Sequence, residues 1–552
     1  MQTRYFSLLA ALPFFGAFAQ QPLAIPPALQ QDTFMLNVGP HTHQFYPGLN
    51  TPTLGVNGEF LGPTLIFNHG DTARLRVQND MTEITTMHWH GMHVSGDQDG
   101  GPQRVIEPGE HWDAKYKVVN PAGTYWYHPH PHMMTASQVT RGVAGMIIVR
   151  DDAESALDLP RTYGVDDIPV VIQDRRFLAN GNMVVTAYGD SLLVNGTPRP
   201  YVDLPAQVVR LRLLNGSNSR VYQVGLQGDS TFHMIAGDGG LLNATVPLQR
   251  LPLSNGERAE ILLDLSGMEG DSLLLMSFGS ELSETVPGSA NILWETSALN
   301  GIDFPLLRIR VQAPTADPLT TIPTTLVSVT PIPVSEATRT RVKTITGNGM
   351  VSMGMFLING QEFNMDVVND TVALGSTEIW TFVNSSNMAH PMHIHGVSFF
   401  VIDRNGIPVA PEEAGAKDVV LVERSETVRT IMRFDHPTNG YPYMYHCHNL
   451  MHEDHMMMLQ FNVTDLTTSI SEAVASTEVH VYPNPTSSSV RYEAPFAVES
   501  VRVMDLTGRV LQRISGNGSA AGTIDMDSLP AGLYMLSLEG SDASARVRVV
   551  RE

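Results

Sequence analysis

The feature that most constrains the fold is a block of sequence that occurs three times. Each block opens on an Asn-Gly pair and continues through an apolar, strand-like run that ends close to a further Asn; the pairs start at Asn57, Asn195 and Asn359. Each block closes on a glycine 33 to 37 residues after its first asparagine: Gly91, Gly228 and Gly396. Repeats of this length are whole domains and not the units of a solenoid. The sequence therefore predicts three related domains.

Strand patterns dominate the chain, and helix patterns are few. Residues 72–77 alternate between polar and apolar side chains, and residues 145–149 form a short apolar run of strand length. The 46 glycines and 36 prolines suit many short strands and turns better than long helices. We therefore predict an all-β chain with three β-sandwich domains, at residues 23–155, 160–314 and 335–466.

The start of the chain has the pattern of a secretory signal peptide, at residues 1–19. Arg4 supplies the positive charge, residues 5–18 are mostly apolar, and Ala17-Phe18-Ala19 has the small residues of a cleavage site. No later stretch approaches twenty apolar residues, so we expect no membrane span in the mature protein. The formal net charge of -22 argues against nucleic acid as a partner.

The residues around the single cysteine predict a metal site. Cys447 is the only cysteine in 552 residues, so an exported chain cannot form an internal disulfide, and a metal is the expected occupant of the thiol. His446 and His448 flank it, and His452 and Met457 follow. Thiolate, imidazole and a weak thioether form the ligand set of a blue-copper electron-transfer site. Because side chains alternate faces along a strand, Cys447 would point to one metal centre and its two neighbours to another.

Three further histidine clusters precede this stretch. They contain His88 and His90, then His128 and His130, then His390, His393 and His395. The two imidazoles of a His-x-His pair on a strand share a face, whereas a histidine three residues earlier can serve a different centre. The second block has Gly225-Leu226-Gln227 where the other two have a His-x-His pair. We therefore expect metal in the first and third domains, with the second as a spacer or as part of a substrate site.

Chance explains only part of this pattern. With 20 histidines in the chain, about one His-x-His pair is expected at random, and six occur when overlaps are counted. We take His41-Thr42-His43 as the accidental pair and His132 as an extra histidine that binds no metal.

The four motifs, in this order, resemble those of the multicopper oxidases, in particular the laccases, copper-efflux oxidases and bilirubin oxidases. The resemblance covers residues 30–465, and the runs 123–130 and 446–457 look most like bacterial copper-efflux oxidases. It implies cupredoxin-like sandwiches that hold four coppers. The type 1 copper would be bound by His390, Cys447, His452 and Met457. The type 2 copper would be bound by His88 and His393, one type 3 copper by His90, His128 and His448, and the other by His130, His395 and His446.

The resemblance also implies the reaction. A donor would lose one electron at a time to the type 1 copper, and four electrons would reduce O2 to water at the other three coppers. Cys447 would carry the electrons between them. Asp99 and Glu453 match acidic positions that relatives use to deliver protons, although an Asp-Gly turn is the alternative role of Asp99. The donor stays open among a phenol, an aromatic amine, a bilirubin-like pigment and Cu(I).

Two other functions compete with an oxidase. A copper-sequestering or electron-carrying protein without oxidase turnover needs only the type 1 site, so the eight further histidines argue against it. A copper nitrite reductase usually has two domains per chain, so three repeats argue against that as well.

The methionines bear on the choice of donor. Copper-efflux oxidases gather Cu(I) with a long Met-rich insertion that this chain lacks, although it has 27 methionines. Met350, Met353 and Met355 are our candidates for Cu(I) binding, with core packing as the alternative. Asp418 resembles an acidic residue near the donor site of those relatives, with an ordinary solvated charge as the alternative.

The C-terminal residues 477–552 predict a separate small β-sandwich without a ligand cluster. Its motifs at residues 482–485, 503–510 and 529–536 resemble the C-terminal sorting domain of the type IX secretion system. The resemblance implies the type IX machinery as a partner, transit through the periplasm, and an extracellular or cell-surface location. A generic adhesion-type β module is the alternative.

Overall fold

The computed structural model describes residues 20–291, 296–350, 354–465, 479–505, 509–540 and 544–552. The predicted signal peptide lies outside these residues. The chain divides into two compact units, residues 1–464 and 465–552.

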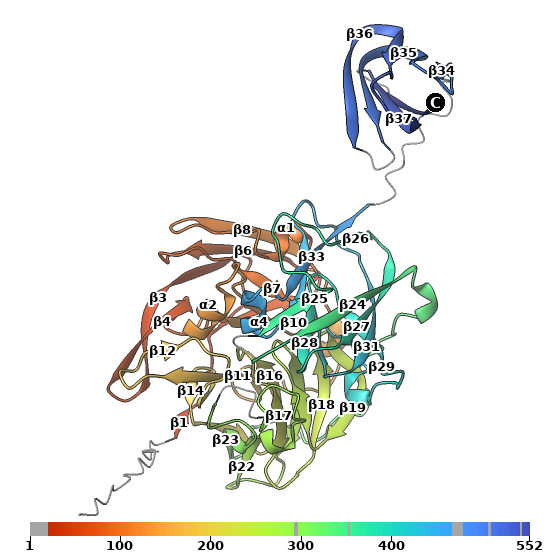
Figure 1. Cartoon of the computed structure of the whole chain (residues 1–552). Helices are drawn as coiled ribbons and strands as arrows, with labels where there is room; N and C mark the ends of the chain where they lie inside the picture. Colours follow the sequence, from red (N-terminus) through yellow and green to blue (C-terminus); the bar gives the residue numbers. More distant parts are fainter. Residues whose placement is uncertain (1–19, 292–295, 351–353, 466–478, 506–508, 541–543) are drawn as a thin grey trace, which may run out of the picture. The chain divides into compact units, whose positions relative to one another are not determined.

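The first domain consists of two sheets (Figure 1). The four-stranded sheet has the order β4-β3-β6-β8, with β3 (Phe34–Tyr46), β4 (Leu49–Val56), β6 (Thr72–Asn79) and β8 (His111–Lys117). The five-stranded sheet has the order β2-β5-β10-β9-β7, with β2 (Ala28–Leu29), β5 (Thr64–Asn68), β7 (His88–His90), β9 (Gly123–His128) and β10 (Gly145–Arg150). The strands expected at residues 72–77 and 145–149 are therefore β6 and β10.

The second domain is built in the same way. Its eight-stranded sheet contains β11 (Asp167–Phe177), β12 (Met183–Val184), β13 (Ser191–Val194), β14 (Thr197–Pro198), β16 (Val208–Asn215), β18 (Phe232–Gly237), β19 (Gly240–Leu248) and β21 (Arg258–Asp264). Its six-stranded sheet contains β1 (Gln21–Pro22), β15 (Pro200–Pro205), β17 (Tyr222–Leu226), β20 (Leu251–Leu253), β22 (Ser272–Phe278) and β23 (Asp303–Gln312).

The third domain has two five-stranded sheets. The first has the order β25-β24-β27-β31-β29, with β24 (Arg339–Asn348), β25 (Met355–Ile358), β27 (Thr377–Asn384), β29 (Phe399–Arg404) and β31 (Thr427–Arg433). The second has the order β26-β33-β32-β28-β30, with β26 (Asp370–Ala373), β28 (His390–Ile394), β30 (Val419–Val422), β32 (Tyr443–Cys447) and β33 (Met458–Thr464).

The Asn-Gly pair that opens each block has the same structure three times. Asn57, Asn195 and Asn359 all have positive φ, at 55°, 50° and 54°. Each side-chain oxygen accepts a 2.8 Å hydrogen bond from a backbone N–H in an earlier strand of the same domain, that of Asn37, Val171 or Thr344. That earlier strand pairs in parallel with a later strand of the block: β3 with β6, β11 with β16, and β24 with β27. The repeat in sequence is therefore a repeat in structure.

The asparagine at the end of each of these later strands is also shared. Its side-chain oxygen accepts the N–H of the residue two positions later, in the pairs Asn79 and Met81, Asn215 and Ser217, and Asn384 and Ser386. This arrangement ends each strand in the same turn, because the side chain replaces a backbone partner. In the first and third domains the chain then enters the strands that carry the histidine pairs, β7 and β28.

Helices are few and short in the described residues. They are α1 (Gly96–Asp99), α2 (Thr135–Arg141), α3 (Asp152–Ser155) and α4 (Leu450–Asp454), with 3-10 turns at Gly279–Glu281, Val334–Glu336 and Pro411–Glu413. The helices α2 and α4 lie side by side although they belong to the first and third domains (Figure 1). Two backbone N–H groups at the start of α2, those of Thr135 and Ala136, each donate a 3.0 Å hydrogen bond to Asp454 of α4.

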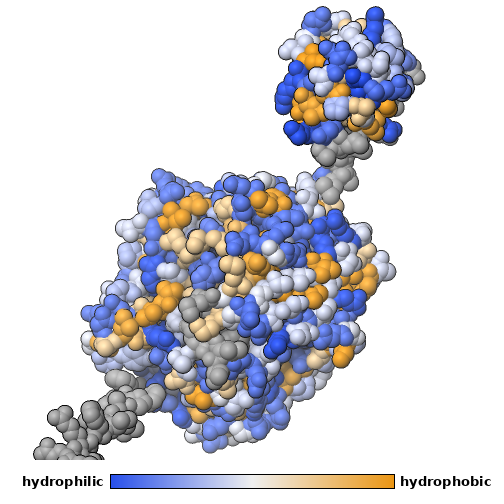
Figure 2. Space-filling model, in the orientation of Figure 1, coloured by the Kyte–Doolittle hydropathy of each residue, from blue (hydrophilic) through white to orange (hydrophobic). Residues whose placement is uncertain are grey.

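Each domain of the first unit has its own buried apolar core. Phe34 and Ile147 belong to the first core, Leu211 and Ile261 to the second, and Trp380 to the third. On the face shown in Figure 2, apolar residues are scattered among polar ones. In the described part of the chain, no helix is long and apolar enough to cross a membrane.

The second unit is a five-stranded sheet with a core of its own. Its strands are β34 (His480–Tyr482), β35 (Ser489–Met504), β36 (Val510–Asp525), β37 (Gly532–Glu539) and β38 (Ser544–Arg551). Val490, Ile524 and Leu536 are among its fully buried residues. The prediction of an all-β chain is confirmed for both units, while the domain boundaries given above stay predictions.

Candidate metal centres

The outer cluster consists of His390, Cys447 and His452, and Met457 lies in the same core. The Sγ atom of Cys447 lies 3.5 Å from Nδ1 of His390 and 3.4 Å from Nδ1 of His452. Met457 is fully buried in the same core, and its carbonyl accepts a 3.2 Å hydrogen bond from the Cys447 N–H. The structure therefore brings together one sulfur and two ring nitrogens at the spacing that a single metal ion needs.

Local structure explains how these residues converge. Strand β32 pairs with β28, so that Cys447 lies opposite Met392 and next to the strand that begins at His390. Asn449 caps helix α4 by accepting the Met451 N–H, and the helix carries His452 back over the cysteine. The ring of Phe356 packs against both imidazoles, with centroids 4.8 and 4.6 Å away. Apolar packing thus holds the two rings in place around the sulfur.

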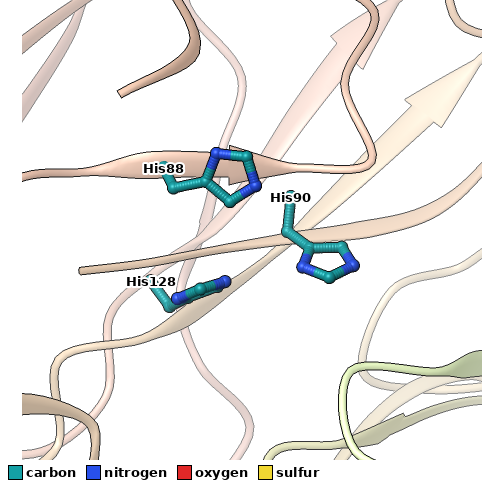
Figure 3. Close-up of side chains that lie close together, drawn as sticks. All are labelled: His88, His90 and His128. Carbon is teal, nitrogen blue, oxygen red and sulfur yellow. The ribbon is translucent and has the colours of Figure 1, made fainter. Parts of the chain in front are cut away.

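The inner cluster consists of eight histidines from the first and third domains. They are His88, His90, His128, His130, His393, His395, His446 and His448, and none is more than 1% exposed. Figure 3 shows three of them, with His88 and His90 on strand β7 and His128 on the neighbouring strand β9. The eight imidazoles therefore lie together in one buried cluster, with short distances between neighbouring rings.

The two neighbours of Cys447 point into this inner cluster. Nε2 of His446 lies 3.3 Å from Nε2 of His130 and 3.2 Å from Nε2 of His395. On the other side, Nε2 of His448 lies 3.2 Å from Nδ1 of His90. The alternation expected along this strand is therefore present: the cysteine joins one cluster, and both flanking histidines join the other.

Three histidines of the inner cluster leave Nε2 without a hydrogen-bond partner, and His448 leaves Nδ1 without one. In His88, His128 and His393 the Nδ1–H donates to a backbone carbonyl, that of Asp99, Pro129 and Asp418 respectively. The opposite nitrogen, Nε2, is buried and has no partner in any of the three. A buried acceptor without a partner lowers the stability of the fold, and a bound metal ion would supply that partner. This pattern fixes the tautomer that a metal ligand needs, so the residues fit a metal.

Burial also favours the protonation state that binds metal. It lowers the pKa of most inner histidines well below the usual range, including His90, His128 and His395, and their neighbouring imidazoles lower it further. Burial lowers the pKa of His390 to about 3. Burial raises the pKa of the Cys447 thiol, so without metal this cysteine is a protonated, unreactive group. Neutral imidazoles and one thiol that a metal can deprotonate suit copper.

Comparison with known proteins agrees with this donor set. Residues 37–154 and 332–466 match family models described as multicopper oxidase, and residues 480–552 match the secretion system C-terminal sorting domain. The protein named multicopper oxidase mco from Staphylococcus aureus is 34% identical over 431 residues, which are 76% of this chain and 86% of that protein. The chain belongs to the multicopper oxidase family. Family membership implies copper binding and supports oxidase chemistry in general, and the sorting domain indicates export to the cell surface or beyond.

Two other similar proteins show how far names diverge in this family. A protein named cell division protein FtsP from Xenorhabdus nematophila is 35% identical over 79% of this chain and 92% of its own length. The solved structure of a laccase-like multicopper oxidase CueO from Ochrobactrum is 33% identical, with a TM-score of 0.72 over 80% of this chain and all of that chain. These likenesses show a cupredoxin-like multicopper oxidase fold.

The two acidic residues expected to deliver protons both contact the inner cluster. Asp99, at the end of helix α1, accepts a 2.8 Å hydrogen bond from Nδ1 of His395. The carboxylate of Glu453 lies 3.4 Å from Nδ1 of His130 and 3.3 Å from Nδ1 of His446. Burial, together with Asp454, raises the pKa of the Glu453 carboxyl well above its usual range. Asp99 is 1% exposed and touches a candidate ligand, so it does more than end a surface turn.

Asp418 is fully buried, so it is not the solvated surface charge that was one of its two expected roles. Its likeness to an acidic residue near the donor site stays a prediction. Its Oδ1 lies 3.1 Å from Nε2 of His90, and its backbone carbonyl accepts a 2.8 Å hydrogen bond from His393. It therefore belongs beside the inner cluster, together with Arg258, which the sequence did not single out. No local signal marks this pair, because its members are 160 residues apart.

The remaining candidates are the methionines proposed for Cu(I) and the histidines expected to bind no metal. Met355 is 61% exposed, Met350 is partly buried, and Met353 lies outside the described residues. His43 forms a 2.9 Å ion pair with Glu59 and, like His132, belongs to none of the metal-capable groups found among the described residues.

Proposed function

We propose that this protein oxidises a donor one electron at a time and uses four electrons to reduce O2 to water. The observation that supports this is the position of Cys447, whose sulfur lies in the outer cluster while its two neighbours reach the inner cluster. Copper at the outer cluster would exchange single electrons with the donor, and copper at the inner cluster would bind and reduce O2.

The proposed ligand set follows the contacts. His390, Cys447, His452 and Met457 would hold one copper in the outer cluster. In the inner cluster His130, His395 and His446 form one compact group of three, which we assign to a type 3 copper. His90, His128 and His448 would hold the second type 3 copper, and the partnerless Nε2 atoms of His88 and His393 would hold the type 2 copper. The total is four coppers per chain.

The protein's own residues supply what surrounds the metals. The peptide bonds on either side of Cys447 connect the two clusters along one strand, which gives electrons a short covalent path. Both clusters are buried, so their residues exclude bulk water. Asp99 and Glu453 each touch an inner histidine, and we propose that they deliver the protons that reduction of O2 consumes.

The donor class is a separate part of the proposal. We propose a phenol, an aromatic amine or Cu(I), delivered from outside the cell. The similar Ochrobactrum protein is described as acting on lignin model compounds and lignosulfonate, which favours an aromatic donor. The exposed thioether of Met355, in the segment that leads to Phe356 beside the outer cluster, favours Cu(I).

A second candidate is a copper-binding protein involved in copper tolerance without oxidase turnover. The similar proteins named cell division protein favour this candidate, because their name shows that not every similar protein is named as an oxidase. The complete inner cluster argues for the oxidase, since a protein that only binds or carries copper needs one outer site.

We further propose that residues 1–19 are a signal peptide and that the sorting domain hands the chain to the type IX machinery after transit through the periplasm. The sorting-domain match at residues 480–552 supports this route.

Oxygen uptake by the copper-loaded protein tests the proposed function. The full chain is loaded with copper, its copper content is measured, and O2 uptake is followed with a simple phenol and with Cu(I) as donors. We expect about four coppers per chain and O2 consumption with at least one donor. A protein that holds its full copper content but consumes no O2 with either donor would refute the oxidase and leave the copper-binding alternative.

A further inference from the structure

Contacts from all three domains of the first unit meet at Asp418. This residue precedes strand β30 of the third domain, and its carbonyl accepts the Nδ1–H of His393, from the same domain. Its Oδ1 accepts the Nε2–H of His90, from the first domain. Both carboxylate oxygens also accept hydrogen bonds from Arg258, at the start of strand β21 in the second domain.

The hydrogen bonds of Arg258 are specific to a guanidinium. Nη1 and Nη2 donate to the two oxygens of Asp418, each at 2.6 Å. Nε donates to the carbonyl of Thr124 at 3.1 Å, and further donors reach the carbonyls of Gly256 and Asp238. Arg258 is 1% exposed and Asp418 is fully buried. A planar fork with five donors fits this arrangement, whereas the single ammonium of a lysine does not.

Two glycines show how tightly this pair is packed against the inner histidines. A Cβ atom on Gly91, the residue after His90, would lie 2.5 Å from Oδ2 of Asp418 and 2.7 Å from Nη2 of Arg258. A Cβ atom on Gly256, two residues before Arg258, would lie 2.9 Å from the ring of His448. The second domain therefore reaches the inner cluster at two points although it supplies none of the candidate ligands.

Asp418 could instead be a metal ligand, because it forms a compact group with His90 and His393. The hydrogen bonds argue against this role. Both of its oxygens are taken by Arg258, and Oδ1 in addition accepts from His90. A carboxylate in this position orients a histidine and sets its tautomer, which leaves Nδ1 of His90 to face His448 and a metal.

We propose that Arg258 is a positioning residue of the inner copper centre, and that it acts through Asp418 to fix His90 and His393. This inference rests on the proposed function, because it takes the inner histidines as copper ligands. It gives the ligand-free second domain a defined role: its arginine holds a carboxylate that orients one ligand from each of the other two domains.

Arg258→Lys in the full chain tests this role, because it keeps the buried positive charge but loses the fork. The matched control is Arg212→Lys in strand β16 of the same domain. Arg212 is equally buried and binds both oxygens of Asp167, at 2.7 and 3.0 Å, but the structure gives it no contact with a candidate ligand. Each protein is loaded with copper and dialysed against graded concentrations of a chelator. Total copper, the blue absorption of the outer site and the type 2 electron paramagnetic resonance signal are then measured.

We expect Arg258→Lys to keep the blue absorption of the wild type while its inner coppers bind about 10- to 100-fold more weakly, with an altered type 2 signal. Arg212→Lys should hold its inner coppers like the wild type. If Arg258→Lys does not fold, the double variant Arg258→Met/Asp418→Asn removes the charges of both partners and should show the same selective loss. The inference is overturned if the Arg258 variant that folds binds its inner coppers as tightly as the wild type. It is also overturned if Arg212→Lys loses its inner coppers to the same extent. A wild-type protein that binds no copper in the inner cluster would instead refute the proposed function on which it rests.

Discussion

Cys447 owes its position to the two-residue period of a strand. Its sulfur and the imidazoles of His446 and His448 leave β32 and the residue after it in opposite directions, toward the outer and the inner cluster. Burial keeps its thiol protonated when no metal is present, so the residue has little reactivity of its own. Its chemistry therefore depends on what binds between it and the two outer histidines.

Replacing Cys447 by serine tests this dependence. A hydroxyl is nearly isosteric with the thiol but is a poor ligand for copper, so Cys447→Ser should lose the blue absorption and all donor oxidation. The inner cluster is untouched, so about three coppers should remain bound per chain. Visible absorption, copper content and circular dichroism check this. A variant that stays blue and active would contradict the assignment of the cysteine.

Glu453 is the second residue whose removal gives a specific expectation. Glu453→Gln keeps the shape of the side chain next to His130 and His446 but cannot carry a proton. We expect kcat for O2 uptake to fall about 10²- to 10⁴-fold, with the blue absorption and the KM for the donor unchanged. The control is Asp454→Asn, since this neighbouring carboxyl binds the N–H groups of helix α2 and no candidate ligand. Because Asp454 also raises the pKa of Glu453, the kcat values are compared at the pH optimum of each variant. An equal fall in kcat for both variants at their optima would mean that α4 was disturbed rather than proton delivery.

At the level of strands and turns, the sequence predicted what is local and repeated. The three blocks that open on an Asn-Gly pair predicted three related domains, and the structure has the same positive φ at Asn57, Asn195 and Asn359. Asparagine suits this position because it tolerates positive φ and its side chain can replace a backbone partner. The face that each candidate ligand takes on its strand also follows from the sequence, since the period of two needs no tertiary information.

The contact between Asp418 and Arg258 could not be predicted in this way. It joins strands of different domains that are brought together only by tertiary packing, and neither residue stands in a motif. A charged residue is normally exposed, so no pattern in the sequence favoured a buried position for Asp418 over one at the surface. Its burial is possible only because Arg258 neutralises it.

The shared turn supports a comparison of stability between domains. The side chain of Asn195 is almost fully buried and makes three hydrogen bonds, to Val171, Ala24 and Pro169. Asn195→Ala should lower the free energy of unfolding by about 2–3 kcal/mol, because buried partners are left unsatisfied. Asn359→Ala should cost less, because that side chain is exposed and water replaces the lost hydrogen bond. Chemical denaturation of the two variants checks the order, and equal losses would contradict the argument from burial.

At the scale of the whole first unit, the second domain connects to both metal clusters without contributing a candidate ligand. Ala187 and Tyr188 pack into the core that surrounds the outer cluster. Ser219 donates a 2.7 Å hydrogen bond to Asn449, the cap of the helix that carries His452. Together with Arg258, these contacts make the geometry of both clusters depend on how the second domain is packed.

The second unit, which contains the sorting domain, makes no such contribution to the metal clusters. Its core residues all lie between Val479 and Val549, and its described residues supply no member of either cluster. A chain that ends at residue 465 should therefore fold, take up about four coppers and oxidise its donor with the kcat and KM of the full chain. In cells it should stay in the periplasm, because it lacks the segment that matches the secretion sorting domain. Copper content, donor kinetics and cell fractionation of the two chains check both halves of this prediction. A truncated chain that loses its inner coppers would show that the sorting unit supports the metal centres, and one that still reaches the cell surface would show that export does not depend on residues 466–552.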